Sequence, residues 1–131
     1  MGRRGRNNLM DETFFFITTT VVKFIPVFNK PLFCDILISN IKHYREKYKF
    51  SILGYVIMLT HFHWIIEVDD EVIRDQKMFW TKLNYIHKNP VKSGLVLKVE
   101  DYKYSSARNY AFNDRSVLEV NTELGGIDLY S

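Results

Sequence analysis

The sequence predicts an α+β domain in which helices pack on an antiparallel sheet. Two apolar segments, 51–58 and 61–68, are joined by a two-residue link, which is typical of an antiparallel hairpin. An aromatic and β-branched segment at 13–22 is typical of a strand, and apolar residues at helical spacing predict helices at 30–47 and 76–88. With 131 residues, 47% of them hydrophobic, the chain has the size and composition of one compact domain.

The first strand and the first helix are predicted from residue types and spacing. Segment 13–22 is aromatic and β-branched almost throughout, so we expect a central strand that is buried on both faces. Asn29 is a candidate N-cap for the helix that follows, and Pro31 stands near its first turn. The apolar residues that predict the packing face of this helix are Phe33, Leu37, Ile41, Tyr44 and Tyr48.

The strand 61–68 carries the first candidate site residues. Because successive side chains of a strand point to opposite faces, His61, His63 and Glu67 share one face. The opposite face is apolar and is expected to join the core: Phe62, Trp64, Ile66 and Val68. Two imidazoles about 7 Å apart on one strand are suitable ligands for a divalent metal. The pair is incomplete, so a third ligand has to come from another part of the chain.

The second helix carries the remaining candidates. Pro90 is expected to end it, because proline restricts the preceding residue, Asn89, to extended conformations. The flank predicted to meet the sheet is formed by Phe79, Trp80, Leu83, Ile86 and His87. Tyr85 lies about 200° around the helix from Leu83 and shares its stripe with Asn89, four residues later. Asn89 is therefore a candidate oxygen ligand for the metal, one turn after a tyrosine hydroxyl.

Charge and cysteine content limit the classes of partner and compartment. Lysine and arginine exceed aspartate and glutamate by 18 to 15, which is compatible with a nucleic-acid partner. Basic residues gather in an N-terminal arm with Arg3, Arg4 and Arg6, in a cluster with Lys42, Arg45, Lys47 and Lys49, and at His87, Lys88 and Lys92. The single cysteine, Cys34, cannot form an internal disulfide, and no signal peptide or apolar run of about 20 residues occurs. We therefore expect a cytoplasmic protein without a membrane segment.

These residue types together predict phosphodiester chemistry. A divalent ion held by His61, His63 and Asn89 can polarise a phosphodiester, and Tyr85 can attack it once its hydroxyl is activated to the phenolate. The attack leaves a covalent phosphotyrosine and a free hydroxyl. Because this link keeps the energy of the phosphodiester, a second strand end can be joined without ATP. The expected activity is nicking and rejoining of DNA.

Several segments resemble the single-tyrosine HUH transposases, and within them the REP-associated tyrosine transposases of bacteria. The matching segments are 15–20, His61-Phe62-His63 and the specific block from Tyr85 to Val96, and segment 101–110 is similar to the one that follows in this family. The resemblance covers most of residues 1–110. It implies a ferredoxin-like β-α-β-β-α-β core with helices packed on an antiparallel sheet.

The resemblance also implies the reaction and its residues. The metal ligands implied are His61, His63 and Asn89, holding Mg²⁺ or Mn²⁺, and the nucleophile is Tyr85, which forms a 5′-phosphotyrosine intermediate. The substrate implied is a single-stranded DNA hairpin. The residues expected to contact this DNA are Arg3, Arg4, Arg6, Lys88 and Lys92.

One departure from the family concerns the length of the core. The family normally has several dozen residues, including a helix and a further strand, between the histidine strand and the tyrosine helix. Here only residues 64–84 separate His63 from Tyr85. A crossover needs about a dozen residues or more, so the short acidic link after Val68 cannot cross the sheet in the usual way. We expect a core reduced by a missing helix and strand, an element exchanged between two copies, or a decayed protein that no longer cleaves.

The sequence thus predicts three regions and leaves two functions open. The regions are a basic N-terminal arm at 1–12, a transposase-like catalytic domain at 13–111 and a loosely ordered C-terminal tail at 112–131. The first function is that of a metal-dependent DNA transposase, acting as a monomer or homodimer. The second is that of a catalytically degenerate module that binds single-stranded nucleic acid through basic and exposed aromatic residues. The complete set of candidate site residues favours the first, and the missing segment favours the second.

Overall fold

The fold is a three-stranded antiparallel sheet with helices on both of its faces. The computed structural model of the chain describes residues 14–68 and 76–123. The strands are β1 (Phe15–Thr20), β2 (Ser51–Ile57) and β3 (His61–Glu67), and their order in the sheet is β1-β3-β2. The predicted hairpin is confirmed, since β2 pairs with β3 antiparallel and Ile57 lies opposite Phe62. The α+β class with helices packed on an antiparallel sheet is also confirmed.

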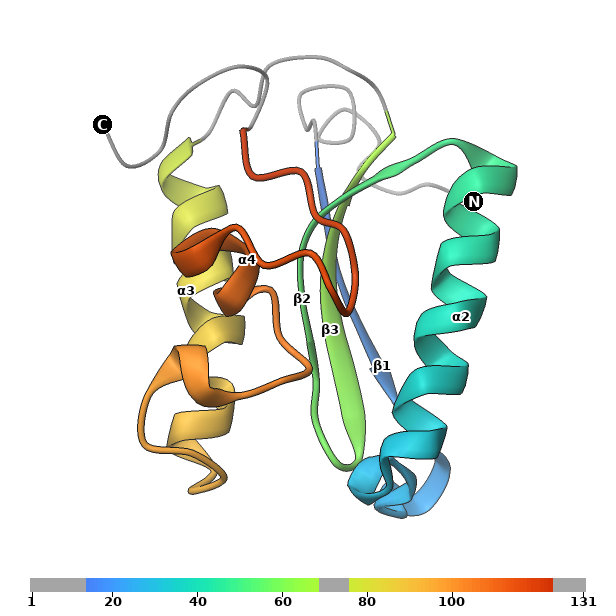
Figure 1. The fold of residues 1–131 in the computed structure, drawn as a ribbon, viewed down its shortest axis with the longest axis vertical. Helices are drawn as coiled ribbons and strands as arrows, with labels where there is room; N and C mark the ends of the chain where they lie inside the picture. Colours follow the sequence, from blue (N-terminus) through green and yellow to red (C-terminus); the bar gives the residue numbers. More distant parts are fainter. Residues whose placement is uncertain (1–13, 69–75, 124–131) are drawn as a thin grey trace, which may run out of the picture.

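Three α-helices complete the described domain. Helix α2 (Pro31–Tyr48) covers one face of the sheet, whereas α3 (Gln76–Lys92) and the short α4 (Ala107–Phe112) lie on the other side (Figure 1). Short 3-10 helices are formed at η1 (Val22–Phe24), η2 (Val27–Asn29) and η3 (Val99–Asp101). The core side chains contributed by α2 and α3 are Cys34, Ile38, Ile41, Phe79, Leu83 and Ile86. Because both faces are covered, β3 is buried in the centre of the sheet.

The prediction that β1 is a central strand, buried on both faces, is wrong. β1 pairs only with β3 among the described strands, so it is an edge strand. Its first residues are half-buried and Thr18, Thr19 and Thr20 are exposed. The aromatic and β-branched composition of segment 13–22 indicates a strand, but it does not tell how many neighbours that strand has.

The expectation that Val68 joins the core is also wrong. Val68 is 52% exposed, since β3 ends at Glu67.

Helix α2 confirms the predicted range but uses a different face. Its N-cap is Lys30, without a side-chain hydrogen bond, so the prediction of an Asn29 cap is wrong, while Pro31 does occupy the first turn. Ile41 is buried as expected, but the rest of the buried side is shifted to Cys34 and Ile38. The predicted packing residues that remain exposed are Phe33, Tyr44 and Tyr48. The apolar stripe of the helix is wider than its contact with the sheet. Spacing alone therefore did not tell which side of the stripe is buried.

Helix α3 continues through Pro90, and the prediction that the helix ends before this residue is wrong. The helix ends with a Schellman motif, in which Leu95 N–H donates to Pro90 O at 2.9 Å and Gly94 N–H donates to Val91 O at 3.0 Å. Gly94 has φ +78°, the left-handed conformation that this motif requires. Pro90 is itself buried. A proline in the last turn costs one intrahelical hydrogen bond, and the packing and the cap compensate for it.

The segment after α3 covers the outer edge of β2. Ser105 forms an isolated bridge with Val56, and the Tyr102 hydroxyl donates a hydrogen bond to Ile57 O at 2.6 Å. Leu118 and Val120 are buried in the core, so the prediction of a loosely ordered tail is wrong for residues 113–123. An edge strand that is covered in this way cannot pair with another chain.

The described elements follow the order β-α-β-β-α, the first five of the β-α-β-β-α-β pattern. No further strand occurs in residues 14–68 and 76–123. The loss of a helix and a strand relative to the family stays a prediction. The acidic link and the basic arm with Arg3, Arg4 and Arg6 lie outside the described residues. None of the helices described is long and apolar enough to cross a membrane.

Candidate active site

Two histidines project from the central strand toward α3. His61 and His63 are two residues apart on β3, and their ring centroids lie 4.9 Å apart. Their face of the sheet is the one that α3 covers, because His63 also contacts a ring of α3. The strand period therefore places both imidazoles on one side, as the sequence predicts.

A threonine hydroxyl binds one ring nitrogen of each histidine. Thr18, opposite His63 in the β1–β3 pair, shares a 2.8 Å hydrogen bond with His63 Nδ1. Thr60 shares a 3.1 Å hydrogen bond with His61 Nδ1. When Nδ1 carries the proton and donates to the hydroxyl, Nε2 keeps its lone pair and is free to bind a ligand. Neither threonine was a candidate in the sequence. The β1–β3 register that pairs Thr18 with His63 is a long-range feature, whereas Thr60 directly precedes His61 and its position was a usable signal.

The site keeps both imidazoles neutral. Burial and then the neighbouring charge of His61 lower the pKa of His63 to about 4, and burial also lowers the pKa of His61. His63 is 5% exposed, and its Nε2 is buried without a hydrogen-bond partner in the described parts of the chain. A buried polar atom without a partner costs free energy unless a ligand or water satisfies it. Neutral imidazole is also the form that binds a metal ion.

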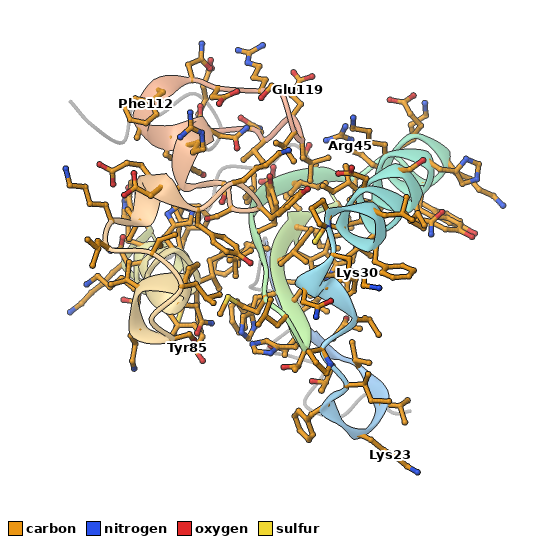
Figure 2. All side chains as sticks on the ribbon, turned by 60° about the horizontal axis from the view of Figure 1, so that its bottom comes forward. Lys23, Lys30, Arg45, Tyr85, Phe112 and Glu119 are labelled. Atoms are coloured by element: carbon orange, nitrogen blue, oxygen red, sulfur yellow. The ribbon has the colours of Figure 1, made fainter. Side chains whose placement is uncertain are left out.

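Tyr85 meets this pair from α3. Its ring centroid lies 5.6 Å from that of His63, at an interplanar angle of 69°. Phe16 of β1 stacks on His63 at 5.6 Å and contacts the Tyr85 ring at 6.3 Å. Tyr85 is 49% exposed and projects from the side of α3 (Figure 2), so a polymeric substrate can reach its hydroxyl. Strands β1 and β3 and helix α3 thus bring His61, His63 and Tyr85 together.

Close packing on β2 positions α3. A Cβ at Gly54 would lie 2.5 Å from Leu83 Cδ1, so a larger residue at this position would force the Leu83 side chain to move. On the same buried flank, His87 Nε2 and the Ser106 hydroxyl lie 2.6 Å apart. The predicted flank is confirmed, with Phe79, Leu83, Ile86 and His87 buried and Trp80 half-buried. The opposite side of the helix is left to present Tyr85.

Asn89 lies one turn after Tyr85 on α3 and is half-buried. Its Nδ2 is buried without a hydrogen-bond partner, and no hydrogen bond joins its side chain to either histidine among the described residues. The amide nitrogen and oxygen exchange places when the side chain flips, so the same side chain can present an oxygen instead. The structure therefore places Asn89 on the stripe of Tyr85, and its role as a third metal ligand stays a prediction.

The donor set fits a divalent ion. Within residues 14–68 and 76–123, no three histidine, cysteine, aspartate or glutamate side chains form a metal site. A third protein ligand beside His61 and His63 would then be of another type, and the amide of Asn89 is one. Two imidazole nitrogens and an oxygen suit Mn²⁺ and the softer divalent ions better than Mg²⁺, which prefers oxygen. A bound ion would also satisfy the buried Nε2 of His63, which has no hydrogen-bond partner among the described residues.

The predicted DNA-binding lysines lie on the surface of α3. Lys88 and Lys92 are exposed, and neither is part of an ion pair in the described regions. At 100° per residue, Lys92 lies about 20° around the helix from Tyr85 and Lys88 about 60°. Both cations are therefore on the side of the helix that presents the tyrosine.

Comparison with known proteins supports the fold. No protein-family model matches the chain, and no curated protein matches it. Among solved structures, it is similar to a REP-associated tyrosine transposase bound to a REP hairpin, with a TM-score of 0.57 and 20% sequence identity. The match covers 86% of this chain and 87% of that chain. At this level of identity the similarity shows a shared fold.

Proposed function

We propose that this chain is a REP-associated tyrosine transposase, which cleaves and rejoins single-stranded hairpin DNA through a 5′-phosphotyrosine on Tyr85. The observation that carries the proposal is the contact of Tyr85 with His63, whose ring also neighbours that of His61, on a fold similar to that of a solved transposase. A nucleophile beside two neutral imidazoles is a combination that strand cleavage requires and that core packing does not.

In the proposed reaction the Tyr85 oxygen attacks the phosphorus of a phosphodiester. The bond between this oxygen and phosphorus forms while the bond from phosphorus to the 3′ oxygen breaks. The phenol proton goes to solvent, and the leaving 3′ oxygen takes up a proton, so a free 3′ hydroxyl remains. The 5′ end stays on Tyr85 as a phosphotyrosine. Attack by another 3′ hydroxyl reverses these steps, joins the strands and releases Tyr85.

The proposed metal site uses the Nε2 atoms of His61 and His63, with the Asn89 amide oxygen as the third ligand. Bound Mg²⁺ or Mn²⁺ would neutralise the charge that develops on the phosphate and favour the phenolate. Thr18 and Thr60 hold the two imidazoles by Nδ1, so that Nε2 faces the substrate side. We infer that Arg3, Arg4, Arg6, Lys88 and Lys92 contact DNA phosphates, since affinity for nucleic acid depends mainly on such contacts.

The test is covalent capture of DNA. Labelled hairpin oligonucleotides with single-stranded arms are incubated with the protein and Mn²⁺ or Mg²⁺ and analysed on a denaturing gel. We expect an adduct with the wild type that is absent from Tyr85→Phe, from His63→Ala and in EDTA. Tyr48→Phe is the matched control, because Tyr48 is also exposed but lies on α2, across the sheet. An adduct that persists in Tyr85→Phe would contradict the proposed nucleophile.

A second candidate function is supported by a separate surface. On α2 the exposed rings of Tyr44 and Tyr48 are stacked 6.0 Å apart at 12°, and Lys47 Nζ lies 5.4 Å from the centre of the Tyr48 ring. Aromatic rings beside cations are suited to stacking with unpaired bases. Binding of the hairpins without an adduct under all metal conditions would favour this catalytically degenerate binding module.

A further inference from the structure

Lys82 places a cation at the candidate active site. Its Nζ lies 4.9 Å from the centre of the Phe16 ring, a cation–π contact between α3 and β1. The same ring stacks on His63 and contacts the edge of Tyr85. One phenylalanine side chain therefore holds the ammonium group, the buried imidazole and the candidate nucleophile in a single cluster.

The helix repeat also directs Lys82 to the tyrosine side of α3. Lys82 precedes Tyr85 by three residues, the spacing at which neighbouring side chains meet on a helix surface. Asn89 continues the same stripe seven residues after Lys82. Lys82 was not among the site residues predicted from the sequence, although its spacing of three residues from Tyr85 was a usable signal. Its contact with Phe16 depends on the tertiary packing of α3 against β1.

The ammonium group of Lys82 has no acidic partner in the parts of the chain that the structure describes. The ion pairs found there are Lys49–Glu46, Arg108–Asp114 and Arg115–Glu119. Lys82 is half-buried, which makes its charge more sensitive to a neighbouring anion than that of an exposed lysine. A cation held by an aromatic ring beside a nucleophile is a suitable partner for a phosphate oxygen.

We propose that Lys82 binds the phosphate that Tyr85 attacks, with Phe16 positioning its ammonium group. The proposal rests on the proposed function and adds a substrate contact to it. Lys82 approaches the phosphate from α3, whereas His61 and His63 face it from β3. The contact stabilises the negative charge of the phosphate before and during attack, without any proton transfer from Lys82.

The experiment measures DNA binding rather than cleavage, so that its result does not depend on the metal or on Tyr85 chemistry. A fluorescent hairpin oligonucleotide with single-stranded arms is titrated in EDTA at several salt concentrations. The variants are Lys82→Met, which keeps the stem over Phe16, and Lys82→Arg, which keeps the charge and stacks on rings. The matched control is Lys42→Met, because Lys42 is exposed and lies on α2, across the sheet from α3.

A phosphate contact has a specific signature in these titrations. For Lys82→Met we expect severalfold weaker binding and a salt slope, log K against log salt, that is smaller by about 0.7. Lys82→Arg and Lys42→Met should keep the slope of the wild type. A merely structural role for Lys82 would change thermal stability but not the salt slope.

A neutral phosphate in the DNA then locates the contact. In a series of oligonucleotides, each carries one methylphosphonate, an uncharged analogue, in place of a backbone phosphate. At one position this replacement should weaken DNA binding by the wild type but should not weaken binding by Lys82→Met any further. If cleavage occurs, that position must be the phosphate that becomes attached to Tyr85. A contact at any other position would overturn the inference.

The two proposals fail in different ways. An unchanged salt slope in Lys82→Met, with wild-type DNA binding and adduct formation intact, overturns only the role of Lys82. A reduced slope without any adduct in the wild type supports the phosphate contact and overturns the proposed reaction. If the wild type binds none of the oligonucleotides, both proposals are wrong.

Discussion

The Thr18 hydroxyl determines the direction in which the His63 ring points. It binds Nδ1 from the neighbouring strand, while Phe16, two residues earlier on the same strand, stacks on the ring at 5.6 Å. Within the described residues, these contacts leave the buried Nε2 without a hydrogen-bond partner. Hydrogen bonds to the second nitrogen of a metal-binding histidine select its tautomer and strengthen binding. At the scale of single residues, Thr18 thus prepares His63 for a ligand.

The substitution Thr18→Val tests this arrangement. Valine has almost the same shape but no hydroxyl, so we expect Mn²⁺ affinity to fall about 10- to 100-fold. Isothermal titration calorimetry with Mn²⁺ measures the effect without DNA. Thr19→Val is the control, because Thr19 is also exposed on β1 but pairs with Phe62 on the other face of the sheet. Equal affinities for the two variants would contradict the role given to Thr18.

At the scale of elements, the position of α3 depends on its contact with β2 and on the way its C-terminal turn ends. Its buried flank approaches β2 at Gly54, and its last turn continues through Pro90 to the Schellman motif at Gly94. The continuation keeps Asn89 helical, and therefore on the stripe of Tyr85 one turn later. A helix that ended before Pro90 would have turned Asn89 away from this stripe.

The C-terminal cap can be tested with Gly94→Ala. A Cβ at this position has no atom within 4 Å, so the substitution acts only through the backbone at φ +78°. A left-handed conformation is unfavourable for alanine, and we expect the free energy of unfolding to fall by about 1 kcal/mol. Urea denaturation followed by circular dichroism measures it. Asparagine tolerates this conformation better, so Gly94→Asn should lose less; a larger loss for asparagine would contradict the explanation.

At the scale of the whole molecule, two weakly acidic side chains, the half-buried Tyr102 and the buried Cys34, are protonated in the folded state. Burial and then the charge of Cys34 raise the pKa of Tyr102 to about 12, and its hydroxyl donates to Ile57 O. Burial and then the charge of Asp35 raise the pKa of the Cys34 thiol to about 11. Both groups favour the folded state only while they are protonated. The segment after α3 and helix α2 are therefore bound to the core more weakly at alkaline pH.

This linkage predicts alkaline unfolding. A raised native pKa gives stability that is complete below the pKa of the unfolded chain and is lost as the pH rises through the native pKa. We expect the free energy of unfolding to fall from pH 9 toward about 12, the range between the ordinary cysteine pKa and the native value of Tyr102. Urea denaturation under reducing conditions at increasing pH measures this decline. It should be smaller in Tyr102→Phe, and an equal decline would contradict the assignment to Tyr102.

Local patterns in the sequence determined most of the helices and strands and the candidate histidine pair. Strand alternation placed His61 and His63 on one face, and the helix repeat placed Tyr85 on one stripe with Asn89. Both inferences use only the spacing of residues a few positions apart. The hairpin and the range of α2 were predictable for the same reason, because tight links and local apolar spacing determine them.

Only the tertiary structure decided which of these local features meet. It showed that β1 is an edge strand, that α3 continues past Pro90, and that Phe16 and Thr18 of β1 contact His63. Each of these depends on strand register or helix packing between residues distant in the chain, which spacing does not encode. The sequence by itself thus determined which side chains are candidates for the chemistry. Long-range packing decided that Tyr85 lies beside His63, because contacts with β2 and β1 position α3.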